Sequence, residues 1–400
     1  MRISTRQYYD TSARAMSDQQ SNLYKVQQQM SSGKKLLTPA DDPVGADQAL
    51  RLQQSLDLTG LYKNNLSAAQ SQLSQSESVL SSMTDSMSDI RSLLVQAGNS
   101  TYGNSERNSI SQELQQKLGN LMGLANSRDG AGFYLFGGNA DNTAPFSQTV
   151  SGVAYNGDQG SRSVQVSGNR NMQLNENGAD LFMRTKTGNG IFDIQPAVAN
   201  TGSAVAMVGR VANASLLTGN NYQVQFTSAN SYQIVNTTTS TTVSSGTYAS
   251  GSVLSVDGME MTITGNPASG DVFDVKPATN KDIFTGLTEL SNLLSQPIST
   301  DADKAKLKTM LNNMINLSDQ TSDSVSAART RIGARSKEVD SLTSLQTDAG
   351  YNYTARLSAI TDVDYAAASV DLTKQTVALQ AAQKSYSMLS QLSLFSYIGG

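Results

Sequence analysis

Apolar residues recur at every seventh position near both ends of the chain. At the start they stand at Tyr9, Met16, Leu23 and Met30, with Ala13, Gln20 and Gln27 at the intermediate position. A longer run follows at Leu52, Thr59, Leu66, Leu73, Leu80, Met87 and Leu94, with Met83 and Ile90 on a second seam. A shorter one holds Ile110, Leu114, Leu118, Leu121 and Ala125. Sustained spacing of this kind predicts long helices packed as coiled coils or bundles.

The same spacing returns in the last third of the chain. It places Leu311, Val325, Ile332 and Val339 in one register, interrupted by Ser318. The final segment repeats Tyr365, Leu372, Leu379 and Tyr386, paired with Ala368, Gln375, Ala382 and Leu389. Both ends of the chain are therefore expected to be helical and to pack together.

The middle of the chain has the pattern of β structure. Residues 222–226 and 232–235 alternate apolar and polar side chains, and residues 272–275 form a further candidate strand. Asp257-Gly258 separates two more strands with a two-residue hairpin signal. The fold class predicted is mainly α with a β insert, in which both chain ends form a long coiled-coil or helical-bundle rod around a central all-β domain.

Three domains follow from these shifts in pattern. Residues 1–40 with 362–400 are expected to form a terminal helical domain. Residues 41–186 with 279–361 are expected to form a helical bundle with a β-hairpin. Residues 187–278 are expected to form an exposed β domain, because the run from Thr201 to Val256 is rich in Ser and Thr and has Arg210 as its only charge. A glycosylated surface is the alternative interpretation of that run.

The terminal helices carry too few apolar residues to be stable alone. Burying a large apolar side chain contributes roughly 1.5–3 kcal/mol, whereas fixing the backbone costs about 1–2 kcal/mol per residue. Glutamines at positions 20, 27 and 375 dilute the seam further. We therefore expect ends that are poorly ordered in a lone monomer and become helical on assembly. An ordinary intramolecular bundle explains the periodicity equally well.

The amino-acid composition excludes several classes of catalytic and metal-binding site. The 400 residues include no Cys, His or Trp, which excludes a Ser-His-Asp triad, a Cys-His pair and any zinc or iron site with His or Cys ligands. The formal net charge of −4 argues against a nucleic-acid partner. No run of about 18 apolar residues is present, and the N-terminus lacks the apolar stretch of a signal peptide. We expect no cofactor, no metal and no enzymatic activity.

Acidic clusters are the remaining candidates for chemistry. Asp41-Asp42-Pro43 resembles a pair of carboxylates for acid–base work or metal binding, but with Pro39 and Pro43 it is better interpreted as the break between two helices, with Asp41 or Asp42 as a cap. Residues 139–142 and 175–178 place oxygen ligands near Gly without the full calcium-loop spacing, so turns are the preferred interpretation.

Several motifs resemble the flagellin superfamily. The block from Met30 to Pro43, with its Thr-Pro-Ala-Asp-Asp-Pro spelling, and the opening Met-Arg-Ile-Ser-Thr resemble in particular the hook–filament junction branch of that superfamily. Residues 125–138, 265–273 and 362–397 resemble its second-helix exit, its last outer hairpin and its C-terminal helix. The likeness covers about 150 residues at the start and 120 at the finish. The tail Ile398-Gly399-Gly400 extends past the expected end.

The resemblance implies a structural role, in which the terminal helical domain of residues 1–40 and 362–400 builds an inner tube. It implies a ring of identical subunits that joins the hook, through hook-associated protein 1, to the flagellin filament, after type III export without a cleaved signal and into an extracellular location. The assembly interface is predicted at Tyr9, Met16, Leu23, Met30, Tyr365, Leu372, Leu379, Tyr386 and Leu389, and the inter-helix loop at Pro39, Asp41, Asp42 and Pro43. A flagellar export chaperone is expected to cover the C-terminal stripe by helix-in-groove binding.

Two other functions remain open. The nearest is flagellin itself, which forms filaments rather than a junction. The more distant is an enzyme or adhesin housed in the β insert, because a fold does not fix a function.

Overall fold

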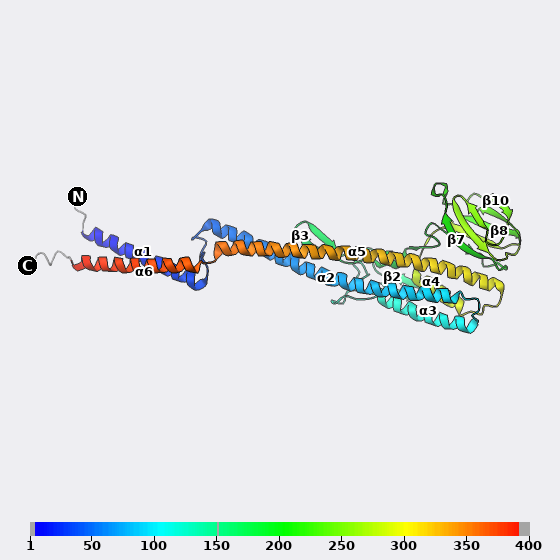
Figure 1. The fold of residues 1–400 in the computed structure, drawn as a ribbon, viewed down its shortest axis with the longest axis horizontal. Coiled ribbons are helices and arrows are strands. Elements are labelled where there is room, and N and C mark those ends of the chain that lie inside the picture. The colour runs from blue at the N-terminus through cyan, green and yellow to red at the C-terminus, as the bar shows by residue number, and fades with distance from the viewer. Residues whose placement is uncertain (1–4, 150–151, 392–400) are drawn as a thin grey trace, which may run out of the picture. The chain divides into compact units, whose positions relative to one another are not determined.

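The computed structural model describes residues 5–149 and 152–391. The helices are α1 (Thr5–Ser32), α2 (Pro43–Ala97), α3 (Asn104–Ala125), α4 (Ile283–Leu294), α5 (Asp301–Thr361) and α6 (Tyr365–Gln391). All described strands lie between α3 and α4 in the sequence (Figure 1). This order confirms the predicted helical ends around a β insert. The chain packs into two compact units, and α2 and α5 contribute residues to both. Unit 1 comprises the described residues of Met1–Asn64 and Ser341–Gly400, and unit 2 is Asn65–Asp340.

Two helical seams in unit 2 bury the heptad positions. The α2 side chains at Leu66, Leu73, Leu80, Met83, Met87, Ile90 and Leu94 are at most 1 % exposed. On α5 the corresponding buried positions are Leu311, Ser318, Val325, Ile332 and Val339. The predicted seven-residue pattern therefore identifies the core of this part of unit 2.

The short helix α4 was not predicted as a separate element. It begins at an N-cap, because the Asp282 side chain accepts a hydrogen bond from the backbone N–H of Thr285 at 2.6 Å. It packs against α3 through buried serines: Ser111 Oγ donates to the carbonyl of Ser291 at 2.8 Å. Gly286 allows close packing on α5, because a Cβ there would lie 2.9 Å from the sulfur of Met314.

The β region contains several small antiparallel sheets. Its strands are β1 (Phe146–Thr149), β2 (Gly152–Tyr155), β3 (Ser163–Ser167), β4 (Arg170–Gln173), β5 (Thr185–Lys186), β6 (Phe192–Pro196), β7 (Val205–Val211), β8 (Tyr222–Ser228), β9 (Ser231–Asn236), β10 (Thr241–Thr247), β11 (Val253–Val256), β12 (Met259–Thr264), β13 (Val272–Pro277) and β14 (Asn280–Lys281). The larger sheets have the orders β10-β9-β8-β13-β6 and β11-β12-β7, and the others are two-stranded. The predicted strands correspond to β8, β9, β11, β12 and β13.

The two larger sheets share one apolar core. Side chains such as Val224, Phe226 and Phe273 from the first sheet cluster with Met261 and Ile263 from the second. The predicted hairpin turn is present between β11 and β12, where Asp257 has φ 44° and Gly258 has φ 79°. Positive φ at both turn residues is typical of the type I′ turn that matches strand twist.

Hydrogen bonds from α5 hold this β core within unit 2. Asn313 Nδ2 donates to the carbonyl of Ile194 on β6 at 3.2 Å, and Gln320 Nε2 donates to the carbonyl of Gly188 at 2.8 Å. The backbone N–H of Ala206 on β7 donates to Thr309 Oγ1 at 3.3 Å. One face of β6 therefore contacts the sheet core and the other faces the helices.

A buried carboxylate anchors the β3–β4 region to α5. Glu176 is 6 % exposed, and its carboxylate oxygens lie 2.5 Å from Arg331 Nη2 and 2.8 Å from Arg335 Nη2. Arg170 on β4 pairs with Glu338 at 2.5 Å. Charged groups thus hold this region to the helix, in addition to the buried apolar side chains Val166 and Met172 of the hairpin.

Candidate functional site

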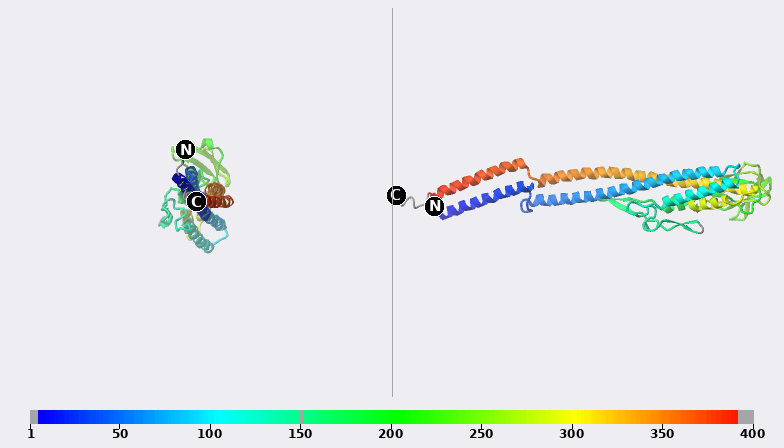
Figure 2. Two further views of the ribbon diagram at one scale, coloured as in Figure 1. Left: turned by 90° about the vertical axis from the view of Figure 1, so that its left-hand side faces the viewer. Right: turned by 90° about the horizontal axis from the view of Figure 1, so that it is seen from below.

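The two terminal helices pair with each other inside unit 1. Figures 1 and 2 show α1 and α6 side by side, and Tyr9 meets Tyr386 edge to face with ring centroids 5.9 Å apart. Gln19 Nε2 donates a hydrogen bond to Gln375 Oε1 across the pair. A polar pair inside an otherwise apolar seam is a device that fixes register in coiled coils. The first and last described helices therefore pack together, as the heptads predicted.

The seam of this pair, called the inner seam below, is only half buried. It contains Tyr9, Met16, Leu23, Val26 and Met30 on α1, and Leu372, Leu379 and Tyr386 on α6. Among the described residues of unit 1, Val26 is the one apolar side chain that is buried, at 7 % exposure. The side chain of Leu389, also predicted at this interface, lies outside the described residues. The described residues of unit 1 therefore form almost no hydrophobic core of their own.

The predicted intermediate positions on α1 were wrong by one residue. Ala13, Gln20 and Gln27 are exposed, whereas the half-buried or buried positions are Ser12, Gln19 and Val26. The reason is geometric. The second residue of each pair on the seam lies three positions after the first, as Ser12 follows Tyr9, whereas the prediction placed it four positions after. On α6 the predicted companions Ala368, Gln375 and Ala382 do lie at half-buried positions.

A second apolar stripe, here called the outer stripe, lies on the exposed side of α6. It consists of Val370, Val377, Ala381 and Met388, and the exposed fractions are 71 % for Val370, 59 % for Val377 and 55 % for Met388. A shallow groove lined by Val370, Val377 and Ala381 runs along it. The spacing of seven, four and seven residues matches a coiled-coil seam that has no partner helix among the described residues. Sequence reasoning followed one heptad register only and did not identify this stripe.

A tight joint connects the loop after α1 to the break between α5 and α6. The backbone N–H of Lys35 donates to the carbonyl of Thr361 at 2.7 Å, and the N–H of Val363 donates to the carbonyl of Gly33 at 3.0 Å. Lys34 Nζ lies 2.6 Å from Asp362 Oδ1. The segment that connects α1 to α2 and the segment that connects α5 to α6 are therefore held together by one short antiparallel bridge.

Gly33 and Tyr365 show how closely the joint is packed. Gly33 has φ 70°, a left-handed conformation that favours glycine, and a Cβ there would lie 3.3 Å from the Tyr365 hydroxyl. Tyr365 itself is 57 % exposed. Its position is at the joint rather than within the inner seam.

The two loop carboxylates have separate structural partners. Asp41 accepts hydrogen bonds from the backbone N–H groups of Leu37 and Thr38 and pairs with Lys25 Nζ at 2.7 Å. These contacts, led by the Lys25 side chain, lower the pKa of Asp41 to about 2. Asp42 Oδ1 accepts from the N–H of Gly45 at 2.9 Å, so Asp42 caps α2, which begins at Pro43.

Asp362 and Asp364 have the corresponding roles on the other side of the joint. Hydrogen bonds from Lys34, Ser358 and Thr361, in that order of weight, lower the pKa of Asp362 to about 2. Asp364 Oδ1 accepts from the N–H of Ala366 at 2.9 Å and so caps α6. The carboxylates at this joint thus stabilise turns and helix starts.

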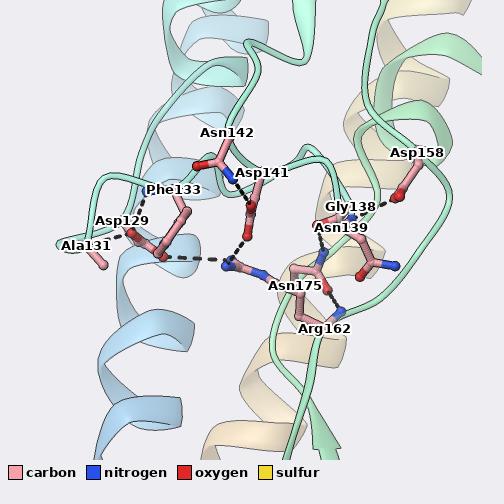
Figure 3. A network of polar contacts seen from close by, with 10 residues as sticks. All are labelled: Asp129, Ala131, Phe133, Gly138, Asn139, Asp141, Asn142, Asp158, Arg162 and Asn175. Atoms are coloured by element: carbon pink, nitrogen blue, oxygen red, sulfur yellow. Dashed lines mark hydrogen bonds and ion pairs between the residues drawn. The ribbon is translucent and has the colours of Figure 1, made fainter.

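The acidic and amide side chains around residues 139–142 and 175 form a polar network with Arg162 (Figure 3). Arg162 Nη1 lies 2.7 Å from Asp141 Oδ2, and its backbone N–H donates to Asn175 Oδ1 at 2.8 Å. Asp129 Oδ1 accepts from the N–H of Phe133 at 3.0 Å. The Arg162 guanidinium thus pairs with Asp141, while Asn175 Oδ1 and Asp129 Oδ1 accept from backbone N–H groups as they do in turns.

Among the residues that the structure describes, no group of three or more carboxylates is placed so that it could hold a metal ion. None of the helices in the described ranges is long and apolar enough to cross a membrane.

Comparisons with known families match most of the chain in three pieces. The profile of the bacterial flagellin N-terminal helical region matches residues 3–141, and that of the C-terminal helical region matches residues 315–398. A profile of the flagellar hook-associated protein 1 D2-like domain matches residues 197–277. The two helical matches contain α1, α6 and the joint.

Individual relatives agree with these matches. Flagellar hook-associated protein 3 of Salmonella typhimurium is 37 % identical over 182 residues, which is 46 % of this chain and 57 % of that relative. The crystal structure of Xanthomonas campestris FlgL superposes with a TM-score of 0.72 at 32 % identity, covering 77 % of this chain and 99 % of the other. A Legionella pneumophila structure described as the flagellar junction protein FlgL gives 0.70 at 28 % identity, covering 79 % and 100 %.

Proposed function

This chain belongs to the family of flagellar hook-associated protein 3, FlgL, and we propose that it is a structural subunit of the bacterial flagellum that joins the hook to the flagellin filament. A ring of subunits contacts hook-associated protein 1 on one side and flagellin on the other. The role is mechanical rather than enzymatic, and it uses no cofactor.

The near absence of a core in unit 1 is the observation that carries this proposal. Unit 1 has long helices but one buried apolar side chain among its described residues, and more than half of the large exposed apolar side chains belong to it. Contiguous exposed apolar surface is typical of a protein interaction site. Neighbouring subunits would supply the missing partner surface and offset the entropy of ordering these helices.

The two apolar surfaces of the terminal helices have different roles in this assembly. The inner seam pairs α1 with α6 of the same chain, and its predicted interface residues Tyr9, Met16, Leu23 and Met30 reach neighbouring subunits only through their half-exposed edges. The outer stripe packs against a helix of the next subunit. The joint, with Pro39 and Pro43 in its loop, sets the angle between the terminal pair and the helices that follow.

Export precedes assembly in this proposal. The subunit passes through the flagellar type III apparatus without a cleaved signal, and an export chaperone covers the apolar face of α6 beforehand. A chain that ends at residue 361 is expected to lose chaperone binding. Undiminished binding of that shortened chain would place the chaperone site elsewhere.

The decisive experiment tests assembly on isolated hooks that carry hook-associated protein 1. Purified monomer is examined by circular dichroism and limited proteolysis, then mixed with those hooks. The junction role predicts saturable binding, protease-labile ends that become protected, and no long polymer. Growth of long filaments by the pure protein would instead favour a flagellin, and rigid ends without any hook binding would contradict the assembly proposal.

A further inference from the structure

A cavity of about 280 Å³ lies within unit 2, between β6 and the helices α4 and α5. Leu293, Met310, Met314 and Leu317 line its helical side, and Asp193 lies on the strand side. It is close to the lower end of the size range of small-ligand pockets. An apolar wall facing a single buried carboxyl group is the feature that distinguishes it.

Two buried acceptor atoms on residues that line this cavity have no hydrogen-bond donor within the described part of the chain. Asp193 is 7 % exposed; its Oδ2 accepts from Gln195 Nε2 at 2.9 Å, but its buried Oδ1 has no partner among the described residues. Asn313 donates through Nδ2 to a backbone carbonyl, and its buried Oδ1 likewise has no partner within the described part of the chain. Buried acceptors without a donor are costly, so such a pair indicates a missing partner.

The cations that line the cavity are occupied elsewhere. Lys281 Nζ lies 2.5 Å from Glu289 Oε2, and Lys306 Nζ donates to the carbonyl of Val198 at 2.7 Å. Burial raises the pKa of the Asp193 carboxyl above its usual range, and the opposing contributions of Gln195, Ile194, Thr187 and the charge of Lys281 offset this desolvation only in part. The protein's own groups therefore leave this carboxyl without a full charge partner.

We propose that the cavity binds an alkyl chain that ends in a guanidinium or ammonium group. The cationic head donates to Asp193 Oδ1 and Asn313 Oδ1, and the alkyl part packs on Met310 and Met314. A guanidinium has five N–H donors in one plane, so it can serve two acceptors at once. The methionine side chains suit an alkyl group of irregular shape because they are flexible and polarisable. The site is separate from the terminal helices and does not rest on the assembly proposal.

Two sources supply this chemistry. One is a free small cation, and the other is an arginine or lysine side chain of a partner protein that reaches into unit 2. Both present the same head group to Asp193, so the shared chemistry is tested first and the source second.

The first experiment titrates the full-length protein with n-butylguanidinium and follows binding by calorimetry. Asp193→Asn keeps the shape of the side chain and removes its charge, so affinity is expected to fall by about 10- to 100-fold, the range for losing a charge-assisted hydrogen bond. Asp274→Asn is the matched control, because Asp274 lies on neighbouring β13 and does not line the cavity. It is expected to bind like the unaltered protein, and n-butylurea, which is neutral, is expected to bind more weakly.

Thermal unfolding without ligand gives an independent readout. Asp193→Asn is expected to raise the melting temperature, because it removes a desolvated carboxyl group whose function is binding. A lower melting temperature together with no guanidinium binding to the unaltered protein would overturn the proposal and make Asp193 purely structural. Unchanged affinity in the Asp193→Asn protein would overturn it as well.

A second titration identifies the source. It uses the blocked tripeptide acetyl-Gly-Arg-Gly-amide beside n-butylguanidinium. Tighter binding of the peptide supports a protein side chain as the occupant, and binding of the free guanidinium alone supports a small molecule. Binding of neither contradicts the site.

Discussion

Replacing two valines of the outer stripe tests the assembly proposal most directly. Val370 and Val377 are 71 % and 59 % exposed, so each still has most of its surface to bury in a complex. Full burial of a valine contributes roughly 1.5–3 kcal/mol, so the remaining burial of the pair amounts to about 2–4 kcal/mol per subunit contact. The double variant Val370→Ser with Val377→Ser is expected to bind hooks about 30- to 1000-fold more weakly.

The same substitutions should leave the monomer unchanged. Serine and valine have similar helix propensities, and neither valine is buried within the single chain. Circular dichroism and the melting temperature of the monomer are therefore expected to match those of the unaltered protein. The assay is saturation of isolated hooks carrying hook-associated protein 1, measured by co-sedimentation.

A helical control separates a specific effect from a general loss of apolar surface. Val95, on α2 in unit 2, is 55 % exposed, and Val95→Ser is expected to bind hooks normally. An unchanged half-saturation concentration for the double variant would refute the assignment of the outer stripe. An equal loss in the Val95 control would show that the effect does not depend on the stripe.

Three further predictions concern stability. Leu379→Ser is expected to weaken the inner seam by about 1–2 kcal/mol because this leucine is half buried. Limited proteolysis should then cut the terminal helices of the monomer faster, and an unchanged cleavage rate would contradict the pairing of α1 with α6. Glu176→Ala removes the carboxylate that pairs with Arg335, whose side chain is 17 % exposed. The free energy of unfolding, measured by chemical denaturation, should fall by about 2–3 kcal/mol, and Glu176→Asp should lower it less. The lowered pKa values of Asp41 and Asp362 mean that their stabilisation of the joint is complete above about pH 4 and is lost as the pH falls towards about 2. Protease sensitivity of the joint should therefore rise as the pH falls through that window. The rise should be absent from a variant in which both residues are asparagine.

The long helices were predictable because their cores repeat. Residues such as Leu73 and Leu80 are fully buried, and the seven-residue spacing extends over many turns, so no other regular structure fits the pattern. The short helix α4 has too few turns for its period to stand out beside the strands that precede it. Short strands such as β1 and β4 likewise carry too little alternation to be recognised, whereas the equally short β11 was marked by the Asp257-Gly258 turn that follows it.

In the terminal helices, the seven-residue spacing does not identify which individual residues face the partner helix. Gln19 and Gln20 are chemically identical, so the sequence alone does not tell which one faces α6. The outer stripe was missed because Asp, Thr, Lys and Gln stand between Val370 and Val377 and obscure the second register. The predicted division into three domains, and the interface role of each seam residue, remain predictions.

The cavity at Asp193 was unpredictable for a different reason. In the strand Phe192-Asp193-Ile194 all three side chains are buried, because the sheet core covers one face and the helices cover the other. A two-residue period assigns Asp193 to solvent, and only the tertiary packing of α5 against β6 places it inside. Local pattern contains no information on such long-range contacts.

The joint between Gly33 and Val363 has a consequence for the order of folding. The ion pair between Lys34 and Asp362 joins positions 328 residues apart, and the hydrogen bond between Gln19 and Gln375 joins positions 356 apart. Closing so long a loop in an unfolded chain is entropically unfavourable and slow. Once Gln70 of α2 contacts Ser336 of α5, only residues 43–69 of α2 and 337–361 of α5 separate that contact from the joint, so the loop left to close is much shorter. The terminal pair should therefore form last, so the natural precursor of the finished subunit is a chain with a folded unit 2 and unpaired ends.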